Sequence, residues 1–107
     1  MSNKPEPKYM FFRYEQANDK KHKLQAVFHN KKTGREKRVK FGAVGYEDYT
    51  IHKDKNRQEN YIARHKKREN WNDPMTAGFH SRWVLWNKPD FAESVRDAHK
   101  RMLELGY

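Results

Sequence analysis

The stretch TAGFHSRWVLWNKP, Thr76–Pro89, is the most apolar part of a chain that is otherwise dense in lysine and arginine. Its tryptophans, Trp83 and Trp86, are three residues apart, which predicts that they lie on one face of a short helix that ends before the closing proline. A helix this apolar is normally buried, although tryptophan also anchors protein interfaces. We expect a core segment that packs between a sheet and the C-terminal helix, with Arg82 and Lys88 at its solvent edge.

The next stretch, DFAESVRDAHKRMLELGY, has the pattern of an amphipathic helix. Asp90 can cap its start, and Glu93 completes a pattern typical of a capping box. Gly106 stands where a left-handed residue often closes a helix. The apolar stripe expected to pack on the sheet consists of Phe91, Val95, Ala98, Met102 and Leu105.

Three segments upstream have the composition and alternation of β-strands: YMFFRY (Tyr9–Tyr14), KLQAVFH (Lys23–His29) and REKRVKFG (Arg35–Gly42). The residues NKKTG between the second and third segments favour a tight turn. In the third segment Val39 and Phe41 alternate with basic residues, so one face is apolar and the other basic. We therefore expect an antiparallel meander.

A further helix is expected at KNRQENYIARHKKRE, Lys55–Glu69, where Tyr61, Ile62 and His65 share one stripe. The fold class is α+β: a three-stranded antiparallel meander packed against about three helices in a single small domain. Residues 1–8 contain two prolines and are expected to form a flexible tail, with the domain spanning 9–107.

Charge is the dominant feature of the composition. The chain of 107 residues has a net charge of +10 and no cysteine, so it has neither disulfides nor thiolate ligands. Between Lys20 and Arg68 there are 16 basic and 5 acidic residues, whereas the rest of the chain is close to neutral. Such a field favours nucleic acid, acidic protein surfaces or anionic lipid heads over a merely solubilising role. No apolar run reaches the length of a membrane span or a signal peptide.

The residues predicted to bind nucleic acid or another acidic partner lie on the expected third strand and on the expected middle helix. On both elements they are close enough in sequence to follow a phosphate backbone without reading its sequence. They are Arg35, Lys37, Arg38, Lys40, Arg57, Arg64, Lys67 and Arg68.

No pattern of catalytic residues is recognisable. The six histidines have neither paired spacing nor cysteine partners, so we expect no metal site and no cofactor. His52 and His65 are instead expected to form hydrogen bonds at the edges of elements. Ser81 lacks a nucleophile elbow, and the acids near Asp54 are surrounded by cations and suit salt bridges better than a magnesium site. We therefore expect no enzymatic activity and no small-molecule substrate.

Three stretches carry a resemblance: FGAVGYEDYTIHKD (Phe41–Asp54), YIARHKKRENW (Tyr61–Trp71) and TAGFHSRWVLWNKP (Thr76–Pro89). With the final helix, they resemble a family of small basic proteins of large double-stranded DNA viruses of eukaryotes, such as iridovirus-, marseillevirus- and phycodnavirus-like groups. The resemblance covers Phe41 to about Met102, and His80 departs from it where an aromatic residue is expected. It implies an uncharacterised or virion-associated protein and supplies no catalytic residue.

The expected function is that of a non-enzymatic structural protein of a virus particle, a small basic minor capsid or capsid-associated protein. Its partners would be capsid or other virion proteins and the phosphates of double-stranded DNA. Its location would be the virion, and the host cytoplasm or nucleus during assembly. The alternative is a sequence-independent DNA-binding protein that packages or compacts the genome, and a nuclease is the third class.

Overall fold

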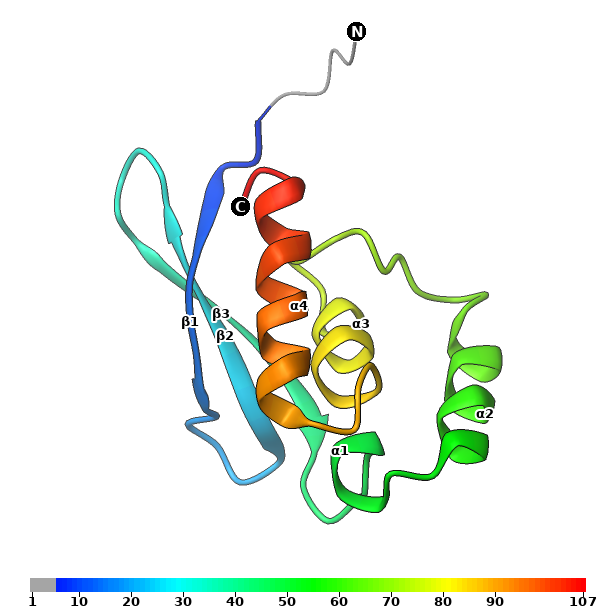
Figure 1. Ribbon diagram of the computed structural model, residues 1–107. Helices are drawn as coiled ribbons and strands as arrows, with labels where there is room; N and C mark the ends of the chain where they lie inside the picture. Colours follow the sequence, from blue (N-terminus) through cyan, green and yellow to red (C-terminus); the bar gives the residue numbers. More distant parts are fainter. Residues whose placement is uncertain (1–5) are drawn as a thin grey trace, which may run out of the picture.

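The sheet has three antiparallel strands in the order β1-β2-β3: β1 (Tyr9–Gln16), β2 (His22–Asn30) and β3 (Glu36–Ala43). This computed structural model describes residues 6–107 (Figure 1). The α+β fold and the three-stranded antiparallel meander predicted from sequence are confirmed.

The helices lie on one side of the sheet (Figure 1). They are α1 (Tyr49–His52), α2 (Lys55–His65), α3 (Ala77–His80), a π-helical turn η1 (Ser81–Leu85) that continues α3, and α4 (Phe91–Glu104). Aspartates begin three of them: the carboxylates of Asp48, Asp54 and Asp90 accept hydrogen bonds from the first free amides of α1, α2 and α4. α2 is the outermost helix and stands apart from the sheet (Figure 1).

The core lies between the sheet and the pair formed by α3–η1 and α4. The sheet contributes alternate residues of β2 and β3, and the helices contribute residues of α3–η1 and the middle of the apolar stripe predicted for α4, Ala98 and Met102. Its buried members are Ala26, Phe28, Val39, Phe41, Phe79, Val84, Leu85, Ala98 and Met102. The predicted core role of Thr76–Pro89 is therefore confirmed: Phe79, Val84 and Leu85 are buried against the sheet and beside α4.

The two tryptophans of this stretch do not share a face, and that prediction was wrong. In η1 the amide of Trp86 donates to the carbonyl of Ser81, five residues back, instead of four. The additional residue in the turn rotates the chain between the tryptophans. As a result, Trp83 packs toward Arg101 of α4, while Trp86 stacks on Tyr61 of α2, with ring centroids 4.4 Å apart and planes at 2°.

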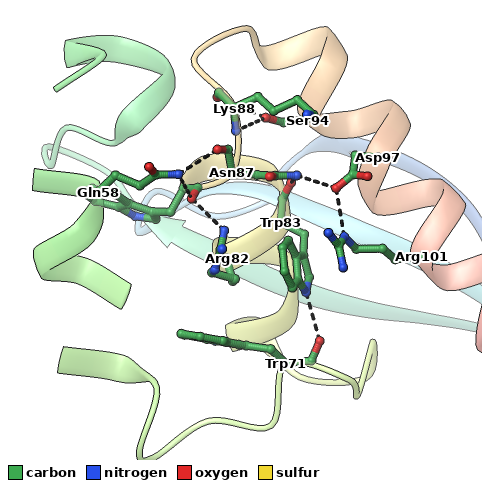
Figure 2. A network of polar contacts seen from close by, with 10 residues as sticks. Gln58, Trp71, Arg82, Trp83, Asn87, Lys88, Ser94, Asp97 and Arg101 are labelled. Carbon is green, nitrogen blue, oxygen red and sulfur yellow. Dashed lines mark hydrogen bonds and ion pairs between the residues drawn. The ribbon is translucent and has the colours of Figure 1, made fainter. Parts of the chain in front are cut away.

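Arg82 is not at the solvent edge, contrary to the sequence-based expectation. Its guanidinium lies 4.2 Å from the ring centroid of Trp83 and 5.4 Å from that of Trp71, and it donates to the carbonyl of Trp86 at 2.9 Å (Figure 2). Arg101 covers Trp83 as well, at 3.5 Å. Burial lowers the pKa of Arg82. The guanidinium groups of Arg82 and Arg101 thus lie over indole rings as cation–π partners.

The C-terminal end of α4 is closed as predicted. Gly106 takes a φ of 96°, its amide donates to Leu103, and the amide of Tyr107 donates to Met102 at 2.8 Å. The carbonyl of Tyr107 then accepts from the amide of Phe11 in β1 at 3.0 Å, which joins the helix to the sheet. The outer members of the predicted apolar stripe, Phe91 and Leu105, are exposed instead of buried.

The predicted tail, residues 1–8, is only partly within the described chain, because residues 1–5 lie outside it. The carbonyl of Lys8 accepts from the amide of Lys31 at 2.9 Å, and Pro7 lies against Gly106. Residues 7 and 8 are thus attached to the domain.

His80 is fully buried at the centre of the core. Its Nδ1 accepts from the hydroxyl of Tyr14 at 2.8 Å, and its Nε2 donates to the carbonyl of Pro74 at 2.6 Å. The rings of Phe28 and Phe41 lie within 5.8 Å of the imidazole. Burial lowers the pKa of His80 from 6.5 to about 4, so the ring is neutral and both of its nitrogens are hydrogen-bonded.

This burial predicts an acid-sensitive fold. Between pH 6.5 and about 4 the unfolded chain binds a proton at His80 and the folded chain does not, so stability is lost as the pH falls through this range. The full loss is roughly 3 kcal/mol, because each pKa unit corresponds to about 1.4 kcal/mol. In urea titrations His80→Phe should flatten the fall in unfolding free energy between pH 7 and pH 4, whereas His99→Gln, at an exposed position of α4, should not. Equal pH profiles for wild type and His80→Phe would contradict this assignment.

Candidate polyanion-binding surface

The structure divides the eight predicted cationic residues into two sets at opposite ends of the molecule. Arg35, Lys37, Arg38 and Lys40 belong to β3 and the turn before it, whereas the others belong to α2 and the turn after it. Figure 1 shows the β2–β3 turn and α2 on opposite sides of α4. The two sets therefore do not form one continuous surface.

On the sheet, the cations of the face without helices are paired with acids. Arg38 lies 2.7 Å from Glu36, and Lys40 lies 3.2 Å from Asp19. Arg13 pairs with Glu15 at 2.7 Å on the same face.

These pairs affect both the acids and the packing of the face. Hydrogen bonds from Gln25 and then Arg13 lower the pKa of Glu15. The aliphatic parts of Arg13, Arg38 and Lys40, on the strands that flank β2, also cover two residues of β2. These residues, Gln25 and Val27, are buried although no helix lies over them. This face is thus close to neutral, although the sequence suggested a basic one.

α2 is attached to the rest of the domain by a buried amide and a ring stack. Nε2 of Gln58 donates to the carbonyls of Trp86 and Asn87, at 2.9 and 2.7 Å (Figure 2). Tyr61 is stacked between Trp86 and His65, and its burial raises its pKa. Asn87 extends the connection to α4 by donating to Asp97 at 2.6 Å. The position of α2 therefore depends on the segment that follows η1.

The C-terminal end of α2 carries a dense set of exposed cations, which we call the α2 basic lobe. Within residues 6–107 none of these side chains has a carboxylate at ion-pair distance. Cations here also complement the partial negative charge of the helix C-terminus. The lobe consists of Arg64, Lys66, Lys67 and Arg68.

Glu69, the acid nearest to the lobe in sequence, is held by other groups. It lies 3.0 Å from His65 and accepts from the indole of Trp71 at 2.8 Å. It also rests against Gly78, where an added Cβ would meet its carboxylate at 2.9 Å. The carboxylate is thus directed toward α3 and leaves the lobe uncompensated.

A cleft of about 590 Å³ lies beside the lobe, between α2, the loop after β3 and the α3–η1 segment. Arg57, Asn60 and Arg64 line it from α2. Its charges cancel, because its lining contains three cations and three acids: Lys23, Arg57, Arg64, Glu47, Asp48 and Glu69.

The acids of the cleft are already engaged by neighbouring groups. Asp48 is buried against Lys23 at 2.7 Å, and Glu47 lies 3.3 Å from Arg57. Of the cleft cations, only Arg64 lacks a carboxylate at ion-pair distance in the described chain, so this residue links the cleft to the basic lobe.

The two histidines singled out by sequence have the structural roles expected of them. Nδ1 of His52 accepts from the amide of Asp54 at 2.9 Å, and His65 pairs with Glu69. In residues 6–107 no three His, Asp or Glu side chains converge in a way that could hold a metal ion. Over the same residues no helix is long and apolar enough to cross a membrane.

Sequence reasoning omitted cations that the structure places beside the predicted ones. Lys66 belongs to the α2 basic lobe, and Lys31 and Lys32 lie in the β2–β3 turn next to Arg35. The signal was present in the runs RHKKR and NKKTGR, which extend beyond the chosen residues.

Comparison with known proteins gives one match. Residues 13–65, a little under half of the chain, are similar to a family of unknown function, DUF5754. This span runs from β1 to the end of α2, so it includes the whole of β2 and β3 but neither α3 nor α4. No curated protein and no solved structure gives a match. The family description assigns no activity.

The attachment of α2 can be tested at Gln58. Gln58→Ala removes two part-buried hydrogen bonds to backbone carbonyls and should lower the free energy of opening α2 by about 1–3 kcal/mol. Native-state hydrogen exchange of the α2 amides measures this change. Glu59→Ala, at the adjacent exposed position, is the matched control. Equal protection in the two variants would show that Gln58 does not hold the helix.

Proposed function

We propose that the protein is a non-enzymatic, capsid-associated structural protein of a large double-stranded DNA virus particle, and that its α2 basic lobe holds the phosphate backbone of the genome. The viral assignment rests on the three stretches quoted above and on the final helix. The contact with the genome rests on one observation: the cations of the lobe are exposed and have no carboxylate partner in the described chain.

The composition of the lobe favours phosphate over a folded protein partner. Protein interfaces have aromatic and apolar centres and are depleted in lysine. The large apolar side chains that are exposed in the described residues all lie outside residues 55–70. Two lysines and two arginines without apolar neighbours suit a regular row of phosphates, which is contacted without sequence readout.

Contacts with other virion proteins fit a different surface. Val44, Tyr46 and Ile51, in the loop after β3 and in α1, are exposed by 53%, 74% and 55%. Aromatic and aliphatic groups of this kind are typical of the centre of a protein interface. The protein would thus have separate surfaces for the genome and for capsid proteins, and would be found in the virion and, during assembly, in the host cytoplasm or nucleus.

The second candidate is a sequence-independent DNA-binding protein that packages or compacts the genome. The same free cations favour it. The two candidates differ in what holds the protein in the particle: a capsid-associated protein stays with DNA-free capsids at fixed copy number, whereas a packaging protein leaves with the DNA. Quantifying the protein in both fractions of opened particles separates them.

The contact with phosphates predicts a salt-dependent affinity. Four phosphate contacts give a slope of log affinity against log salt of about −3 to −4 for duplex DNA. In a background that carries Lys32→Gln, Arg35→Gln, Lys37→Gln, which removes unpaired cations of the β2–β3 turn, the further change Arg64→Gln, Lys67→Gln, Arg68→Gln should reduce the steepness of the slope by about 2 to 3. Fluorescence anisotropy with a generic duplex across a salt series measures both values.

The control is a variant that loses the same charge elsewhere. Lys88→Gln, Arg96→Gln, Lys100→Gln removes three exposed cations on α4 and the segment before it. It should keep the wild-type slope within about one unit. Weak binding of the wild type even at low salt would overturn the genome contact and leave acidic capsid surfaces as the partner.

A further inference from the structure

A second group of cations lies in and next to the β2–β3 turn, and we call it the turn patch. It consists of Lys31, Lys32, Arg35 and Lys37, all exposed. Nζ of Lys31 donates to the carbonyl of Gly106 at 2.9 Å, and Nζ of Lys37 lies 5.5 Å from the ring centroid of Tyr9. No carboxylate lies at ion-pair distance from these side chains within residues 6–107.

Local contacts hold the turn patch in place. The side chain of Asn30 accepts from the amides of Lys32 and Thr33 at 2.9 and 3.0 Å. The amide of Asn30 itself donates to the carbonyl of Arg35, and that of Gly34, with a φ of 73°, donates to Asn30. The turn therefore has a defined shape, and its cations are presented together at one end of the sheet.

The turn patch and the α2 basic lobe are electrostatically independent. They lie on opposite sides of α4 (Figure 1), in a molecule whose long dimensions are 41 and 36 Å. The screening length at physiological salt is only about 8 Å. A charge bound at one patch therefore has little effect on the field at the other.

The sheet face without helices, beside the turn patch, carries compensated charge, because Arg13, Arg38 and Lys40 are paired with acids. On α4 and the segment before it, Arg101 is paired with Asp97 at 2.9 Å, whereas Lys88, Arg96 and Lys100 are exposed and have no carboxylate at ion-pair distance in residues 6–107. A single duplex that followed these α4 cations from one patch to the other is the alternative to two separately bound duplexes, and the Lys88→Gln, Arg96→Gln, Lys100→Gln variant tests it.

We propose that each molecule bridges two nucleic-acid duplexes, one at the α2 basic lobe and one at the turn patch. The inference rests on the proposed contact with the genome and adds a second site and a mode of action. Two phosphate-binding ends on one rigid domain cross-link neighbouring segments of duplex, which condenses DNA without bending it around the protein. Each patch alone contacts about four phosphates, so the protein binds a single duplex weakly. Binding is stronger where several duplexes lie close together, because both patches of one molecule can then be occupied at once.

The test is a two-duplex capture experiment. One short duplex is immobilised, the full-length protein is added, and retention of a second, fluorescent duplex is measured. The wild type should capture the second duplex. Two variants each remove one patch: the lobe variant is Arg64→Gln, Lys67→Gln, Arg68→Gln, and the turn variant is Lys32→Gln, Arg35→Gln, Lys37→Gln. Each variant should still bind the immobilised duplex. Each should retain at least about tenfold less of the second duplex than the wild type does. The Lys88→Gln, Arg96→Gln, Lys100→Gln control should behave as wild type.

A mixture of the lobe variant and the turn variant distinguishes bridging by one molecule from bridging by self-associated molecules. Bridging within a single molecule predicts that the mixture does not restore capture, because no molecule in it has both patches intact. Restored capture would overturn the inference.

The outcomes also separate this inference from the proposed function. A wild type that binds one duplex with the expected salt slope but never captures a second would overturn bridging and leave the genome contact intact. Capture that survives in the turn variant would exclude the turn patch as the second site. A wild type that binds no duplex at low salt would overturn both proposals together.

Discussion

The arrangement of the domain depends on one buried imidazole. His80 sits among phenylalanine rings and joins Tyr14 of β1 to the carbonyl of Pro74, which precedes α3. Both partners would be unsatisfied in a purely apolar core, and a buried polar group without a partner costs about 1–3 kcal/mol. The hydrogen bonds therefore fix which part of α3 faces the sheet. The position of α3 in turn sets η1, to which both α2 and α4 are attached.

Local patterns predicted most of the fold. The three strands, the Asp90 cap and the glycine closure of α4 follow from alternation and from short-range hydrogen bonding, and all are present in the structure. The packing of Thr76–Pro89 also followed, because an apolar segment in a chain this polar has few other places to lie. What the sequence did not predict is the direction of Trp86, because a π turn has no compositional signature that distinguishes it from an α-helix.

The candidate site was harder to predict, because it depends on which charges are neutralised. The sequence gives equal weight to Arg38 and Arg68, yet one is paired with Glu36 and the other has no acidic partner in the described chain. The first case depends on the alternation of side chains along β3, which puts residues 36 and 38 on the same face, and the second depends on the hydrogen bonds that turn Glu69 toward α3. Neither is visible in a count of charges. The net charge of the chain suggested a polyanionic partner as a hypothesis, but the structure was needed to locate the cations that have no acidic partner in the described chain.

Because η1 is a π turn, the number of residues in this segment determines the direction in which the residues after it point. A turn of this kind is equivalent to one residue inserted into an α-helix. A chain shortened by one residue here would keep its hydrophobic composition and its core, but Trp86 would rotate toward the side occupied by Trp83. Tyr61 would lose the ring on which it stacks, and Gln58 would lose the two carbonyls that it binds. Substitutions in Ser81–Leu85 would therefore be tolerated more readily than deletions, since the residue count of this segment sets the direction in which α2 presents its charges.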